Sequence, residues 1–138
     1  MMQRIWSALR SVLAVLAGLV ALTVVAFAFE IPLHWVALKL FPETFPDEAS
    51  LNSNTAWMLS QSLYTIPALL LGGYVAAWLA PHHIVAHAVA MAIVQEMLIV
   101  TLMFAPPHPV PVWMWAVTLI VSPMAIVSGG WFRDRKHR

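Results

Sequence analysis

The 84 residues from position 49 to position 132 carry one formal charge, that of Glu96. A surface that faces water needs charged side chains at short intervals, and roughly a quarter of the residues in ordinary soluble domains are charged. In this chain charged residues make up 9% and hydrophobic residues 62%. The sequence therefore predicts an integral membrane protein whose exterior faces the lipid bilayer.

Four segments are long and apolar enough to cross a bilayer, which takes about 20 residues at a rise of 1.5 Å each. They cover residues 11–29, 56–79, 84–105 and 112–132. We expect an all-α fold, a four-helix transmembrane bundle in which residues 1–138 form a single integral membrane domain. We interpret the first segment as a retained span, because its apolar run of 19 residues is longer than the core of a signal peptide.

The distribution of charge predicts the orientation. Six of the seven Lys and Arg residues lie in the first ten and last six positions, whereas residues 30–55 carry four acidic residues and one lysine. Loops rich in Lys and Arg stay on the cytoplasmic side of a membrane. We therefore expect both termini to be cytoplasmic, the loop 30–55 to be external, and the chain to be a multi-pass protein of a bacterial inner (plasma) membrane.

The start of the expected loop has two interpretations. Residues 31–41 are mostly apolar, Pro32 suits the first turn of a new helix, and Trp35 favours a membrane–water interface. The segment is therefore either a short helix that lies in the interface or an extension of the first span beyond the headgroups. The sequence leaves both interpretations open.

Two of the expected spans share a pattern. Pro67 precedes a Gly-Gly-Tyr sequence and Pro123 precedes a Gly-Gly-Trp sequence, with spacings that differ by one residue. One interpretation is a chain of two parallel helical hairpin repeats. The other is coincidence, since Pro and Gly are both common in membrane helices. Each proline removes a backbone donor, and we expect the neighbouring hydroxyls of Thr65 and Ser122 to bond to the carbonyls left free.

Small residues predict where the helices pack. Lipid tails are as apolar as Leu, so close contact between small residues, rather than burial from water, holds membrane helices together. The second expected span has small residues at intervals of four, and the fourth span has a glycine to match them. We expect this stripe to be the seam for a neighbouring helix; the alternative is a groove for a lipid or ligand. Its residues are Ala68, Gly72, Gly73, Ala76, Ala80 and Gly129.

Glu96 lies near the middle of the third expected span, where an ionised carboxylate is costly unless a partner or water reaches it. We expect it to be neutral and to bond to Gln61 or Thr65 of the second span, within an intramembrane polar site. Three roles are open: a hydrogen-bond staple between helices, a proton carrier, or a contact with a partner subunit. The other expected members of the site are Gln95, Thr23 and Thr118.

The histidines do not predict a metal centre. His83 and His87 stand one helical turn apart, a spacing that metal ligands use, but no third ligand occurs at that depth. We interpret both as interfacial polar residues and expect neither a metal nor another cofactor. The basic C-terminal end is a topology anchor or a contact for anionic lipids, and its shortness argues against nucleic-acid binding.

One run of residues resembles a known kind of protein. Residues 71–80 contain a Gly-Gly-Tyr-Val-Ala sequence that begins at Gly72, and His87-Ala88 follows near the start of the next span. This pattern resembles small uncharacterised four-span membrane proteins of bacteria, which carry a Gly-Gly-aromatic-x-Ala helix, a short turn and a helix that begins with small residues. The resemblance covers the second and third spans, and it implies a four-helix membrane fold without implying an activity.

The sequence shows no nucleophile and base at catalytic spacing, no phosphate-binding loop and no pair of carboxylates in one pocket. The external loop is also too small for a catalytic domain. We therefore expect a non-enzymatic accessory or scaffold subunit, which forms a homo-oligomer or packs against a partner membrane protein. The alternative is a proton-coupled small-solute transporter or channel centred on Glu96. A scaffold should tolerate Glu96→Gln, whereas a proton-coupled carrier should lose its pH-dependent flux.

Overall fold

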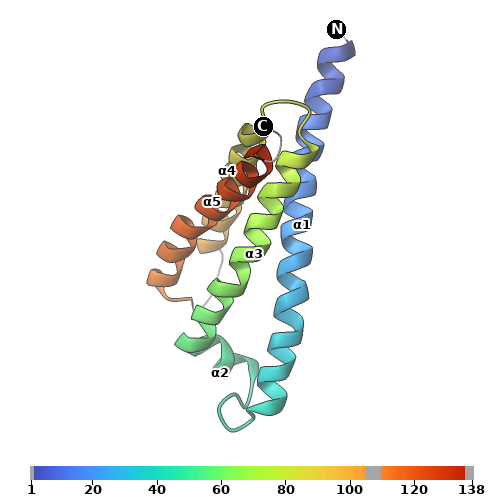
Figure 1. Cartoon of the computed structure of the whole chain (residues 1–138). Coiled ribbons are helices and arrows are strands. Elements are labelled where there is room, and N and C mark those ends of the chain that lie inside the picture. Colours follow the sequence, from blue (N-terminus) through green and yellow to red (C-terminus); the bar gives the residue numbers. More distant parts are fainter. Residues whose placement is uncertain (1, 105–109, 136–138) are drawn as a thin grey trace.

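The computed structural model describes residues 2–104 and 110–135, and each regular element within them is a helix (Figure 1). Four helices are long and apolar enough to cross a membrane, which indicates a multi-pass membrane protein. The prediction of an all-helical chain with four candidate spans is confirmed. The elements are α1 (Met2–Leu40), α2 (Glu48–Ser53), α3 (Thr55–Leu79), α4 (Ile84–Met103) and α5 (Val112–Arg135).

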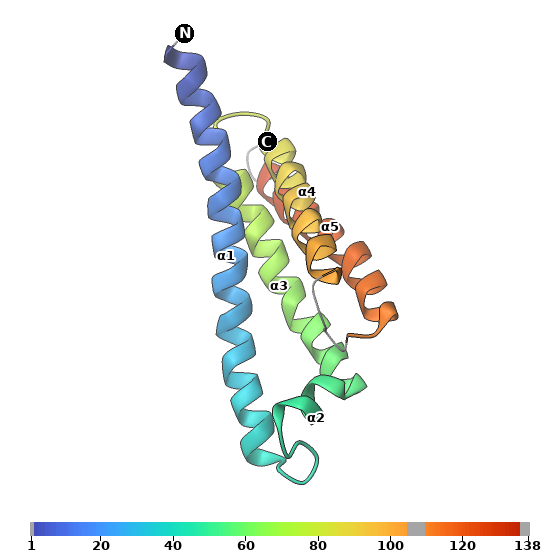
Figure 2. The same cartoon turned by 180° about the vertical axis from the view of Figure 1, so that it is seen from behind.

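The long helices alternate in direction, so the start of α1 and the end of α5 lie toward the same end of the bundle, while α2 lies at the other (Figure 1). The central helix is α3, which lies between α1 and α5 and has its most extensive contacts with these two. The helix α4 packs mainly on α5; it lies behind α5 in Figure 1 and in front of it in Figure 2. The two outer helices α1 and α5 are thus joined through α3.

The first helix is longer than the predicted span. It continues through Pro32 to Leu40 and has 39 residues, or about 58 Å at 1.5 Å per residue. Of the two interpretations of residues 31–41, the continuous extension is the one observed. The expected loop 30–55 is therefore reduced to a turn that precedes α2.

The extension of α1 is stabilised by packing at its far end. Ala37 is 5% exposed, and the ring of His34 stands edge-on to that of Trp57 in α3, with 6.1 Å between the ring centroids. These contacts offset the backbone hydrogen bond that Pro32 removes. In the third span, α4 ends at Met103, and the predicted limit at residue 105 lies outside the described residues.

Small residues bring both neighbours into close contact with α3. On the α1 side, a Cβ atom added to Gly18 would lie 2.7 Å from the Cβ atom of Ala76 and 2.8 Å from the carbonyl oxygen of Gly72. On the α5 side, a Cβ atom added to Gly129 would collide with the backbone of Leu70. The small residues of α3 therefore serve two neighbouring helices rather than one.

The predicted packing residues are buried with one exception. Ala80 is half-buried and lies beyond the last turn of α3, as its C-cap. Gly73 belongs to the α5 side, because a Cβ atom there would collide with the backbone of Ile126. The buried members are Ala68, Gly72, Gly73, Ala76 and Gly129.

Large apolar side chains cover the outside of the bundle. Val20, Leu63, Met97 and Ile120, one from each long helix, are each more than 60% exposed. Soluble monomers rarely expose contiguous apolar patches of more than a few hundred Å². Such an exterior suits a surface that faces lipid.

The turn between α1 and α3 is fixed by capping. The carboxylate of Asp47 accepts a hydrogen bond from the backbone N–H of Ser50 at 2.7 Å, and the backbone N–H of Asp47 donates to the Ser50 hydroxyl at 3.3 Å. The N–H of Ser50 holds the pKa of Asp47 below its ordinary value of 3.8. The short helix α2 that follows buries Leu51, which is 0% exposed.

Gly129→Leu should destabilise the bundle, because the added side chain meets the backbone of α3, which cannot turn aside as a side chain can. Overpacking of this kind costs about 1–3 kcal/mol or more. The matched control is Ala116→Leu on the same helix, where the side chain is exposed. Thermal unfolding in detergent micelles should show a lower midpoint for Gly129→Leu and little change for Ala116→Leu. Equal midpoints would contradict the close contact.

The cap at Asp47 should make α2 sensitive to acid. A carboxyl group with a lowered pKa contributes its stability above its ordinary pKa, here 3.8, and loses it as the pH falls through the lowered value. Protection of the Ser50 amide against hydrogen exchange should therefore begin to fall below about pH 4. In Asp47→Asn, whose amide caps a helix without titrating, the protection should not change over this range. A matching loss in the variant would show that Asp47 is not the cause.

Candidate functional site

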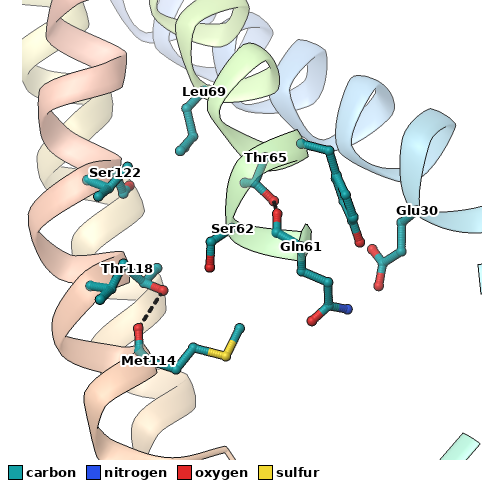
Figure 3. Close-up of a pocket in the computed structure, with 11 residues that line it drawn as sticks. Glu30, Gln61, Ser62, Thr65, Leu69, Met114, Thr118 and Ser122 are labelled. Carbon is teal, nitrogen blue, oxygen red and sulfur yellow. Dashed lines mark hydrogen bonds between the residues drawn. The ribbon is translucent and has the colours of Figure 1, made fainter. Parts of the chain in front are cut away.

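Two hollows in the surface of the bundle contain residues of the predicted polar site. The polar cavity lies between α1, α3 and α5 and has a volume of about 270 Å³ (Figure 3). The Glu96 groove lies between α4 and α5, has a volume of about 570 Å³, and shares no lining residue with the polar cavity. The residues that line the polar cavity are Glu30, Gln61, Ser62, Tyr64, Thr65, Leu69, Met114, Val117, Thr118, Val121 and Ser122.

Each helix brings different groups to the polar cavity. The first, α1, supplies Glu30, whose carboxyl lies beside the phenol of Tyr64 from α3. The side chain of Gln61 also interacts with this phenol. Thr118 and Ser122 face these groups from α5 (Figure 3). Within the part of the chain that the structure describes, Glu30 is the only charged residue that lines the cavity.

Most hydroxyl hydrogens in the polar cavity are already used. Thr65 donates to the carbonyl oxygen one turn earlier in α3 at 2.7 Å, Thr118 does the same in α5 at 2.9 Å, and Ser62 does so at 3.2 Å. Each of these oxygen atoms keeps lone pairs, because a hydroxyl has one donor and two acceptor positions. The cavity therefore offers mainly acceptors.

Ser122 differs from these three residues. Its side chain is 1% exposed, and its Oγ atom has no hydrogen-bond partner within the described part of the chain. We expected it to bond to the carbonyl that Pro123 leaves free, and that prediction is wrong, because the side chain lines the polar cavity instead. The same prediction is wrong for Thr65, whose hydroxyl bonds to the carbonyl of Gln61 rather than to the one that Pro67 frees.

Glu96 does not join the polar cavity. It lines the Glu96 groove, whose other residues are apolar except for Thr101, and its buried Oε1 atom has no hydrogen-bond partner among the residues that the structure describes. The expected bond from Glu96 to Gln61 or Thr65 is therefore wrong. A residue's position along a span gives its depth but not its direction, and α4 is apolar on all sides, so its sequence does not indicate which face turns inward.

The other members of the expected polar site are separated. Gln61, Thr65 and Thr118 come together in the polar cavity. Thr23 is exposed on α1 and donates to a carbonyl oxygen of its own helix at 2.9 Å. Gln95 is half-buried and lines neither hollow. Three residues that the sequence placed at the same depth therefore do lie together. The carboxyl group of Glu96, to which they were expected to bond, lies elsewhere.

Sequence reasoning did not assign Glu30, Ser62, Tyr64 or Ser122 to the predicted polar site. Glu30 was assigned to the external loop, because Pro32 was a candidate start for a new helix. The apolar run after Pro32 was the signal for a continuous helix, which would have placed Glu30 inside it. Nothing in the sequence indicates that Ser122 turns toward a cavity rather than toward its own backbone.

The histidines form a turn rather than a metal site. The Nδ1 atom of His87 lies 3.2 Å from the carbonyl oxygen of His83, which has a left-handed backbone at φ 50° and precedes α4 as its N-cap. His82 stands edge-on to His83, with 5.2 Å between the ring centroids. In residues 2–104 and 110–135, no group of three His, Cys, Asp or Glu side chains is placed to hold a metal ion.

No protein-family model, curated protein or solved structure matches the chain. The resemblance to small four-span bacterial membrane proteins therefore stays a prediction.

Ser122→Ala should raise the stability of the bundle relative to Ser62→Ala by up to about 1 kcal/mol, because only the Ser122 hydroxyl is buried without a partner. Both variants gain the same helix propensity, so their difference isolates the unpaired hydroxyl. Thermal unfolding in the same detergent measures it. A larger loss for Ser122→Ala than for Ser62→Ala would instead show that the Ser122 hydroxyl is bonded in the folded chain.

Proposed function

We propose that the chain is a non-enzymatic accessory or scaffold subunit of a membrane assembly, and that it packs against a second copy of itself through the Glu96 groove. The observation that supports this most is the buried, unpartnered Oε1 atom of Glu96, in a groove between two candidate spans. A carboxyl group in hydrocarbon is costly unless another group bonds to it. Among the residues described, the single chain supplies no such group.

A second copy supplies one. A protonated carboxyl group is both a donor and an acceptor. In a two-fold symmetric contact the same surface of each copy meets, so the same residue of each lies at the same depth. Two Glu96 side chains can therefore bond to each other across the axis. Neither Lys nor Arg is required, and α4 contains neither.

The walls of the Glu96 groove also suit a helix. Ile93, Met97 and Val100 in α4 are 57%, 65% and 41% exposed, and Pro123 and Val127 belong to the opposite wall in α5. Helices associate in membranes through close packing and interhelical hydrogen bonds. The groove offers both, since apolar side chains surround one carboxyl group.

The orientation is part of the proposal and depends on charge. Arg10 lies in the first part of α1 and Arg133 and Arg135 in the last turn of α5, and these two helix ends lie toward the same end of the bundle (Figure 1). Glu43 and Glu48 follow the opposite end of α1. By the positive-inside rule the termini are cytoplasmic, in an inner (plasma) membrane of bacterial type. The hairpin repeat stays a prediction.

A proton-coupled carrier or channel centred on Glu96 draws less support from the geometry. The polar side chains that would lead a proton or a solute to Glu96 line the polar cavity instead, and the two hollows share no residue. This candidate is distinguished by Glu96→Gln, which should abolish pH-dependent solute flux in a carrier and leave the association of a scaffold intact.

Single-cysteine cross-linking tests self-association, because the chain has no cysteine of its own. Val100→Cys places a thiol in the Glu96 groove, and Val24→Cys places one on the exposed face of α1, where the valine is 60% exposed. In liposomes treated with an oxidant, Val100→Cys should form disulfide-linked dimers and Val24→Cys should not. Dimers from neither variant, with a monomeric mass in mild detergent, would overturn self-association.

The contribution of Glu96 is measured on the same dimer. An interhelical hydrogen bond in a membrane is worth about 1 kcal/mol, so Glu96→Leu should weaken dimerisation about fivefold. Glu96→Gln keeps a donor and an acceptor and should preserve it. Equal dimerisation by native chain and Glu96→Leu would show that Glu96 is not at the interface.

A further inference from the structure

We infer that the polar cavity binds a small organic ammonium ion with an apolar body, whose charge pairs with Glu30 and whose N–H groups bond to the oxygen atoms around Ser122. The polar cavity lies apart from the Glu96 groove, so this site does not depend on self-association. Four features of the polar cavity support it: an unpaired hydroxyl, an excess of acceptors, one negative charge, and a mixed polar and apolar wall.

The unpaired hydroxyl shows that a partner is missing. Ser122 is 1% exposed and its Oγ atom has no partner among the described residues, yet it lines the polar cavity. Leaving such a group unsatisfied costs about 1–3 kcal/mol. A molecule in the cavity would be within reach of Ser122 and would remove this penalty on binding.

The excess of acceptors indicates a ligand that donates. The hydroxyls of Ser62, Thr65 and Thr118 already donate to backbone carbonyls of their own helices. Their oxygen atoms can therefore only accept hydrogen bonds from a ligand. In Figure 3 Thr118 faces Ser62 and Thr65 across the cavity, with Gln61 between them and Glu30. An ammonium group has N–H donors and no acceptor, which is the complement of this arrangement.

The charge of the cavity indicates a cation. Among the described residues, Glu30 is the one charged residue that lines it, and neither Lys nor Arg does. The histidine nearest to Glu30 in the sequence, His34, lies 3.7 Å from the carboxylate of Glu48 instead. Hydrogen bonds between a carboxylate and an ammonium group are about twice as strong as those between neutral groups.

The size and the apolar wall favour an organic molecule over a bare ion. A volume of about 270 Å³ equals that of roughly nine water molecules at about 30 Å³ each, far more than one metal ion fills. Leu69, Val117 and Val121 form apolar parts of the wall, which suit a hydrocarbon body. The described residues also contain no group of three His, Cys, Asp or Glu side chains that could hold a metal ion.

Phenethylammonium tests the site, because it joins a primary ammonium group to a compact apolar body, and 2-phenylethanol is its neutral analogue of equal size. Binding is measured by calorimetry on the chain in nanodiscs of phosphatidylcholine, whose headgroup has no N–H, with empty nanodiscs to subtract partitioning. We expect saturable binding of the ammonium ion and at least about tenfold weaker binding of the alcohol.

Three variants show whether binding occurs in the polar cavity. Glu30→Gln keeps the shape of the side chain and should weaken binding about tenfold or more, and Ser122→Ala should weaken it about threefold. Glu43→Gln removes an exposed carboxylate outside the cavity and should change nothing. Thermal unfolding of each variant confirms that the bundle is intact.

Two sources of the ammonium group are separated by adding phosphatidylethanolamine, whose headgroup is a primary ammonium, to the nanodiscs. A lower apparent affinity for phenethylammonium would assign the site to lipid headgroups, and an unchanged affinity would assign it to a free amine; both support an ammonium site. Equal binding of 2-phenylethanol, binding that Glu30→Gln leaves unchanged, or no saturable binding up to millimolar concentration would overturn it. None of these results bears on the cross-linking of the Glu96 groove.

Discussion

The close approach of α3 to both of its neighbours is the constraint on which the rest of the structure depends. Gly18 and Gly72 bring α1 against one side of α3, and Gly73 and Gly129 bring α5 against the other. In hydrocarbon, burying an apolar side chain gives little free energy, because lipid tails are equally apolar. Close packing between backbones therefore replaces the hydrophobic effect that holds soluble bundles together. The four-helix arrangement is therefore set where side chains are smallest, and the large apolar residues are left to face outward.

The position of these glycines accounts for the position of the polar cavity. In α3, Gln61 precedes Gly73 by twelve residues, or about 18 Å, and in α5, Ser122 precedes Gly129 by seven residues, or about 10 Å. Helices that meet backbone to backbone at one level and are inclined to each other separate further along, as α1, α3 and α5 do toward the α2 end (Figure 1). At that level polar side chains from three helices occupy the gap, and they fill it incompletely.

A feature could be predicted from the sequence when it depends on neighbouring residues in the chain, and could not when it depends on contacts between helices. Hydropathy is summed along the chain, so the four long helices were predictable without knowledge of their contacts. The rotation of α4 was not, because lipid-facing and protein-facing positions are equally apolar there, and Glu96 was assigned to the wrong neighbours. The length of α1 could not be predicted either, because Pro32 removes a backbone hydrogen bond and favours a break in the helix. The ring contact of His34 with Trp57 and the burial of Ala37, which favour a continuous helix, form only in the folded chain.

Glu30 and Glu96 show that a charged residue with only apolar neighbours in the sequence is not always the one that marks a polar site in the fold. Glu96 is the single charge in a long apolar stretch, yet polar side chains gather around Glu30. Thr65 and Thr118 explain how: a hydroxyl that donates to a carbonyl of its own helix is satisfied within an apolar segment and still presents an acceptor. An acceptor-rich cavity can therefore be built from membrane helices without adding charge to them, and α1 then contributes the one carboxyl group. In the Glu96 groove Thr101 is the single lining residue of this kind among those described, and the buried Oε1 atom of Glu96 has no hydrogen-bond partner in the described part of the chain.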